Sequence, residues 1–149
     1  MRQLSFVLQF HGSAMPVAAS PQILRAKTTA TNQTFGTVIG ADSLQATLTS
    51  PGGGQAAFES RVVLHEDGSF DETGTITYGD LGTVDFHTLG KGYLFPSGMA
   101  GLQRGGVLWE VTRGTGQFVG ATGIITSNFS VASDGQVVDT HCAVLYLPE

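Results

Sequence analysis

The segment that decides the fold lies near the C-terminus and reads RGTGQFVGATG (Arg113–Gly123), GIITSNFSVAS (Gly123–Ser133) and QVVDTHCAVLYLP (Gln136–Pro148). Its four glycines give the spacing G-x-G-x-x-x-G-x-x-G, which differs from the dinucleotide pattern G-x-G-x-x-G, and no G-K-[ST] follows them. A phosphate site also needs a helix whose N-terminus holds the anion, but the run after these glycines is β-branched and alternating. The segment therefore predicts a connection between strands, not a nucleotide site.

Strand-like runs separated by turn residues fill most of the remaining chain. With the N-terminal segment they give about eight strands, at the spacing typical of an antiparallel sandwich or barrel. No sustained 3.6-residue period indicates a helix. We therefore predict one all-β domain over residues 1–149. The runs are SLQATLTS (43–50), QAAFESRVVLHE (55–66), SFDETGTITY (69–78), TVDFHTLGKGYLF (83–95) and GGVLWEVT (105–112).

The composition excludes several classes of partner. Charged residues make up 13% of the chain and the net charge is −5, with no basic run. Nucleic-acid backbones and anionic membrane surfaces need clustered cations, so neither is an expected partner. Cys142 is the single cysteine, which excludes an intrachain disulfide and a multi-cysteine zinc site and fits a reducing compartment. We expect neither a metal nor a cofactor.

The N-terminus has two interpretations. MRQLSFVLQFHGSAMPVAAS (1–20) has a basic start, an apolar stretch and a small-residue end, as an export signal does. However, Leu4, Phe6, Leu8 and Phe10 alternate with mostly polar neighbours, which is typical of a strand with one buried face. We predict the strand, and with it a cytoplasmic location. Export remains the alternative.

Two Asp-Gly pairs predict hairpins, and their spacing gives a register. If Asp134 and Gly135 are the two loop residues, Phe129 opposes Thr140 on an apolar, core-facing side, while His141 opposes Asn128 on a polar side. If Asp67 and Gly68 are likewise the two loop residues of a hairpin, neither face of that hairpin is cleanly apolar. This register places Glu59, Arg61, His65 and Glu72 together on one face, as an ion lattice or as a partly polar lumen.

The stretch GTGQFVGATG (Gly114–Gly123), followed by a strand and VVDTHCAVLYL, resembles the C-terminal part of the allene oxide cyclase and dirigent families. This resemblance covers about a quarter of the chain and implies an eight-stranded antiparallel barrel, calycin-like in form. It further implies an apolar ligand in the lumen, a cyclisation or coupling reaction, and a homodimer or homotrimer. Phe118 would plug one end of the barrel, and Gly114 and Gly116 would adopt positive φ. The families' catalytic residues lie in regions without a match, so none is carried over.

Four residues are candidates for acid, base or oxyanion-stabilising roles. Glu110 inside an apolar barrel would have a raised pKa and could protonate an oxygen, although alternation with the inward Trp109 favours an exposed position. His141 beside Asp139 could act as an acid or base, or lie on the solvent face of its hairpin. The other two candidates are His87 and Arg61.

The substrate-binding candidates are aromatic, namely Trp109, Tyr93, Phe86 and Phe129. Together these features predict a cofactor-independent cyclase or isomerase that shapes a small, largely apolar metabolite in the barrel lumen. A non-catalytic binder or carrier that uses the same cavity is the alternative. A third possibility is a structural subunit whose barrel is packed solid.

Overall fold

Eleven strands and one 3-10 helix account for nearly the whole chain in the computed structural model, which describes residues 1–149. No helix in it has the length and apolarity that a membrane crossing requires. The strands are β1 (Arg2–Val17), β2 (Ser20–Thr31), β3 (Thr34–Ile39), β4 (Leu44–Thr49), β5 (Gln55–Leu64), β6 (Ser69–Tyr78), β7 (Thr83–Thr88), β8 (Gly92–Pro96), β9 (Leu102–Gly114), β10 (Thr122–Ala132) and β11 (Gln136–Leu147), and the helix is η1 (Gly116–Phe118).

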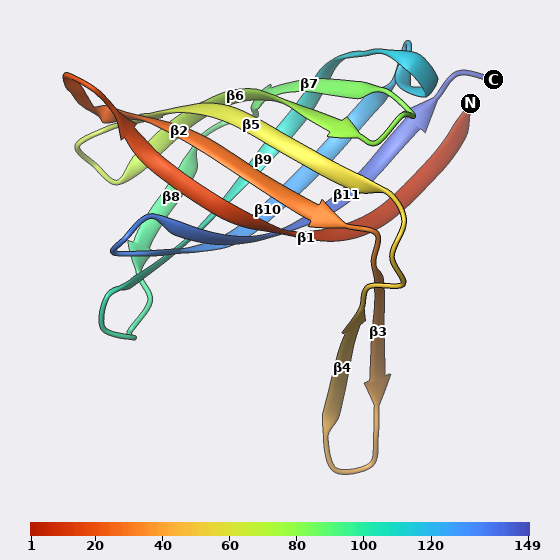
Figure 1. The fold of residues 1–149 in the computed structure, drawn as a ribbon, viewed down its shortest axis with the longest axis horizontal. Helices are drawn as coiled ribbons and strands as arrows, with labels where there is room; N and C mark the ends of the chain where they lie inside the picture. Colours follow the sequence, from red (N-terminus) through yellow and green to blue (C-terminus); the bar gives the residue numbers. More distant parts are fainter.

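Eight antiparallel strands close into a barrel, as the sequence predicts. Their order is β10-β11-β1-β2-β5-β6-β7-β9, and pairing of β9 with β10 closes the ring. The short strand β8 pairs with β6 and β9, beyond the end of β7. Strands β3 and β4 form a separate hairpin that projects away from the barrel (Figure 1). The hairpins β1–β2, β5–β6 and β10–β11 turn at one end of the barrel, and both chain termini lie at the other (Figure 1).

Both Asp-Gly turns are three residues long, not two. His65 pairs with Ser69 around Glu66-Asp67-Gly68, and Ala132 lies opposite Gln136 around Ser133-Asp134-Gly135. Only the glycine of each turn has a positive φ, +83° at Gly68 and +89° at Gly135. A two-residue type I′ turn would need a positive φ at the aspartate as well. Each aspartate instead accepts a hydrogen bond from a backbone N–H two residues ahead.

The predicted registers are therefore wrong by one residue, and the error moves side chains to the opposite face. Phe129 lies opposite Asp139, not Thr140, and Ser127 lies opposite His141. Because side chains alternate along a strand, this slip pairs Val62 with Glu72 on the inner face. Glu59 and Arg61 lie on the exposed outer face, so the predicted cluster of Glu59, Arg61, His65 and Glu72 does not exist.

Aromatic side chains fill the middle of the barrel. Phe58 stacks on Phe86 and on Trp109 with ring centroids 5.5 Å and 5.3 Å apart. Phe10 stacks on the His141 ring at 4.2 Å. All five side chains are nearly or fully buried. This packed aromatic layer divides the lumen into two halves, and the half near the three hairpin turns is the open one.

The glycine-rich segment closes the barrel end that holds the chain termini. Phe118 of η1 is buried there against Tyr78, with ring centroids 5.2 Å apart, as expected of a plug. Gly116 has the expected positive φ, but Gly114 does not. What Gly114 provides is space, because a Cβ at that position would overlap the carbonyl group of Phe118.

We expect Gly114→Ala to lower the free energy of unfolding by about 2 kcal/mol, since the overlap is with backbone that cannot move aside. Gly54→Ala is the matched control, because a Cβ there meets nothing within 4 Å. Urea unfolding followed by circular dichroism measures both. Equal stabilities for the two variants would contradict this role of Gly114.

Candidate functional site

A cavity of about 160 Å³ occupies the half of the barrel near the three hairpin turns. Its walls are mainly aliphatic and aromatic, whereas its polar side chains are few and include two carboxyl groups. Eleven of the sixteen lining residues are hydrophobic. The polar ones are Thr28, Glu72, Gln103, Ser127 and Asp139. An apolar pocket with a few converging polar groups is the usual form of a small-molecule site.

Glu72 on β6 is the most perturbed ionisable group that faces this cavity. Its side chain is buried, with 6% of its surface exposed. The hydroxyl of Ser60 donates to Oε1 at 2.6 Å, and the indole Nε1 of Trp109 donates to Oε2 at 3.1 Å. Burial raises the pKa of Glu72 from 4.5 to about 8, and the charge of Asp139 adds to the rise. At neutral pH the group is therefore a carboxylic acid.

Asp139 and His141 on β11 form a second buried pair. The hydroxyl of Ser127 donates to Asp139 Oδ1 at 2.6 Å, and His141 Nε2 lies 2.9 Å from Oδ2. A carboxylate only accepts hydrogen bonds, so Nε2 carries the proton that it donates. One of the two interpretations of the sequence placed this pair on the solvent face of its hairpin, and the other gave it an acid or base role. The register of the three-residue turn instead places it inside the barrel, with His141 1% exposed.

Two buried polar atoms near the carboxyl groups have no hydrogen-bond partner in the protein. They are the hydroxyl of Thr28, which lines the cavity, and Nδ1 of His141. A buried polar group without a partner costs about 1–3 kcal/mol. The Thr28 hydroxyl is therefore a ready contact for a polar group of a bound molecule.

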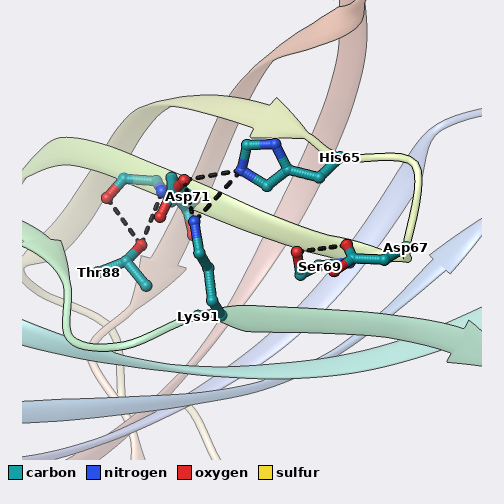
Figure 2. A network of polar contacts seen from close by, with 7 residues as sticks. His65, Asp67, Ser69, Asp71, Thr88 and Lys91 are labelled. Atoms are coloured by element: carbon teal, nitrogen blue, oxygen red, sulfur yellow. Dashed lines mark hydrogen bonds and ion pairs between the residues drawn. The ribbon is translucent and has the colours of Figure 1, made fainter.

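An exposed ion network lies on the outer side of β6, the strand that carries Glu72 (Figure 2). Asp71 Oδ2 is 2.7 Å from both Lys91 Nζ and His65 Nε2. These hydrogen bonds, first from Lys91 and then from His65, lower the pKa of the Asp71 carboxyl. Asp67 accepts hydrogen bonds from the hydroxyl and the backbone N–H of Ser69, which lower its pKa in the same way. Figure 2 shows that Asp71 and Thr88 approach from neighbouring strands.

Three of the four candidates for acid, base or oxyanion roles lie outside the lumen. Glu110 and His87 face each other on the outer wall, with Oε2 and Nε2 3.5 Å apart and side chains 52% and 46% exposed. Arg61 is exposed on β5. Alternation explains all three, because the inward neighbours are Trp109, Phe86 and Ser60.

The aromatic candidates divide between the cavity and its surroundings. Phe129 lines the cavity. Trp109 and Phe86 are buried in the aromatic layer and pack on each other with centroids 4.5 Å apart. Tyr93 is 46% exposed and stacks on Phe95. Ser60, Ser127 and Thr28 were not predicted as site residues, and Glu72 was predicted only as a member of the possible lumen cluster with Glu59, Arg61 and His65. All four of Thr28, Ser60, Glu72 and Ser127 are buried.

This arrangement offers a proton donor and a proton acceptor on one apolar cavity. Protonated Glu72 can give a proton, and Asp139, held by two donors, can accept one. No group of three or more His, Cys, Asp or Glu side chains is placed to hold a metal ion. The chemistry that these residues support directly is therefore proton transfer.

The comparisons with known proteins show a likeness in fold. No protein-family model matches the sequence, and no curated protein matches it. The structure is similar to one described as the pterocarpan synthase dirigent protein GePTS1, with 15% sequence identity and a TM-score of 0.58, over 99% of this chain and 89% of that chain. This match confirms the predicted dirigent-like barrel. It does not confirm the glycine-rich segment as a family motif.

Glu72 makes the stability of the protein depend on pH. Between pH 4.5 and about 8 the folded protein retains a proton that the unfolded chain has lost. This contribution to stability is complete below pH 4.5 and falls as pH rises, by about 1.4 kcal/mol per pH unit. Urea unfolding at several pH values measures the slope.

Glu72→Gln is the control for this slope, because its amide can still accept from Trp109 and donate to Ser60. We expect the variant to lose the decline between pH 5 and 8. Parallel stability curves for the two proteins would contradict a protonated Glu72.

Proposed function

We propose that the protein is a cofactor-independent isomerase or cyclase that acts on a small, largely apolar metabolite inside the barrel. The observation that carries this proposal is the pair of buried carboxyl groups, Glu72 and Asp139, on a mainly apolar cavity. A barrel packed solid would have neither the space nor a use for such groups. A purely apolar cavity would support binding without acid–base chemistry.

The size of the cavity limits the part of the substrate that enters. A closed apolar cavity of about 150 Å³ holds a benzene-sized molecule. The cavity of about 160 Å³ therefore accepts one ring or a short branched chain, and the rest of a larger substrate extends toward the hairpin turns. Asp139 and the net charge of −5 disfavour an anionic substrate.

The reaction follows from the two protonation states. Glu72 gives its proton to a carbonyl, epoxide or enol oxygen of the substrate, and Asp139 removes a proton from the same molecule. The substrate gains one proton and loses one, so the product is an isomer and no other reactant is consumed. Return of the proton from Asp139 to Glu72 restores the site. The apolar walls hold the substrate in the reactive conformation.

A binder or carrier that uses the same cavity is the second candidate. The apolar walls and the free Thr28 hydroxyl favour it equally, because they serve binding and take no part in proton transfer. The predicted cytoplasmic location and the predicted homodimer or homotrimer are separate from this choice and stay predictions.

We expect native mass spectrometry of the protein, purified from its producer, to detect a retained small molecule. Val137→Trp should abolish retention, because Val137 lines the cavity and the larger side chain fills it. Val138→Trp is the matched control, since Val138 is the next residue and lies on the outer face, 37% exposed. Equal retention by both variants would place the ligand outside the cavity.

The retained molecule then separates the two candidates. When the molecule or its precursor is incubated with wild-type protein, it should convert to an isomer of identical mass. NMR spectroscopy monitors this conversion. Glu72→Gln should still retain the molecule but slow the conversion about 100-fold or more. Retention without any conversion by the wild-type protein would favour the carrier.

A further inference from the structure

The barrel wall beside Glu72 is interrupted. Strands β7 and β8 follow one another in the same position between β6 and β9, separated by Leu89, Gly90 and Lys91. On β6, pairing with β7 begins at Thr73 and pairing with β8 ends at Phe70. Asp71 and Glu72 thus have no strand partner on that side, and the backbone N–H and C=O of Glu72 face the gap.

One side chain closes this gap. The hydroxyl of Thr88, the last residue of β7, accepts a hydrogen bond from the backbone N–H of Glu72 at 2.7 Å. The same hydroxyl donates to the carbonyl oxygen of Glu72 at 3.0 Å. Figure 2 shows Thr88 facing the backbone of β6 across the gap, while Lys91 reaches the side chains of Asp71 and His65 and makes no bond to the β6 backbone. A single hydroxyl therefore replaces the two backbone bonds that a continuous strand would supply.

Thr88 is also linked to the group that holds the acid itself. Its cross-strand partner on β9 is Trp109, whose indole donates to Glu72 Oε2. The backbone of Leu89 continues this pairing with a bond to Leu108 at 2.8 Å. Thr88 thus fixes the distance between the backbone that carries Glu72 and the strand that carries its indole partner.

We propose that Thr88 is the positioning residue for Glu72, and that its hydroxyl holds the carboxyl group against Trp109 and away from water by bridging the gap between β7 and β8. This inference rests on the proposed role of Glu72.

The single tryptophan of the chain reports on this arrangement directly. In ¹H–¹⁵N NMR, Trp109 gives one indole N–H resonance, and its bond to Glu72 makes that resonance sensitive to ionisation of the carboxyl. The ionisable group whose charge acts on Glu72 is Asp139 of β11, and His141 of the same strand contacts both Asp139 and the Trp109 ring. Strands β5 and β9 present the uncharged Ser60 and Trp109.

We expect the wild-type indole resonance to titrate with a midpoint near pH 8 and the Glu72→Gln resonance to stay constant over that range. Thr88→Val, which keeps the shape but loses the hydroxyl, should lower the midpoint by about half a pH unit or more, because burial is the largest cause of the raised pKa and a loosened strand admits water. Thr88→Ser should restore it. Lys91→Met, at the same gap, should leave it unchanged.

The outcomes separate the two proposals. A Thr88→Val protein with the wild-type midpoint would overturn the positioning role and leave Glu72 as the acid. If the wild-type indole resonance does not titrate near pH 8, or if Glu72→Gln shows the same titration, the role of Glu72 itself would be overturned. If Thr88→Val does not fold, Thr88→Cys replaces it, and its weaker hydrogen bonds should give a smaller shift in the same direction.

Discussion

The backbone of the two Asp-Gly turns determines which side chains the barrel encloses. In each turn the glycine alone takes the left-handed conformation, so the loop holds three residues and sets the pairing of the strands that follow. Side chains alternate along a strand, and every inward position on β6 and β11 depends on that setting. Glu72, Asp139 and His141 face the lumen for this reason. A one-residue slip would expose all three to solvent.

An enclosed acid opposes folding, and the surrounding residues limit that cost. Moving the Glu72 carboxyl out of water favours its neutral form and raises its pKa, while the hydrogen bonds from the Ser60 hydroxyl and the Trp109 indole offset part of that rise and satisfy both carboxyl oxygens. The aromatic layer below, with Phe58 at its centre, keeps water from that side. The unpartnered Thr28 hydroxyl shows that the polar groups are not all satisfied within the protein. Such incomplete satisfaction is typical of sites that bind a molecule.

The sequence predicts the fold better than the site. Strand-like runs separated by turn residues along most of the chain indicated about eight strands, and the resemblance of Gly114–Gly123 to barrel families implied that they close into a barrel, because these signals are local. The site needs the registers of two hairpins, and Asp-Gly alone does not distinguish a two-residue turn from a three-residue turn. The inward set on β5, namely Ala56, Phe58, Ser60 and Val62, is the signal that would have corrected the register. The gap at Leu89–Lys91 has no such signal.

The central claim is that Glu72 is a neutral carboxylic acid inside the barrel. A ¹³C NMR titration of protein labelled at the glutamate side-chain carboxyl carbons tests it most directly. The account predicts one resonance that titrates near pH 8 and is missing from Glu72→Gln. Titration of every glutamate in the ordinary range near 4.5 would contradict the account.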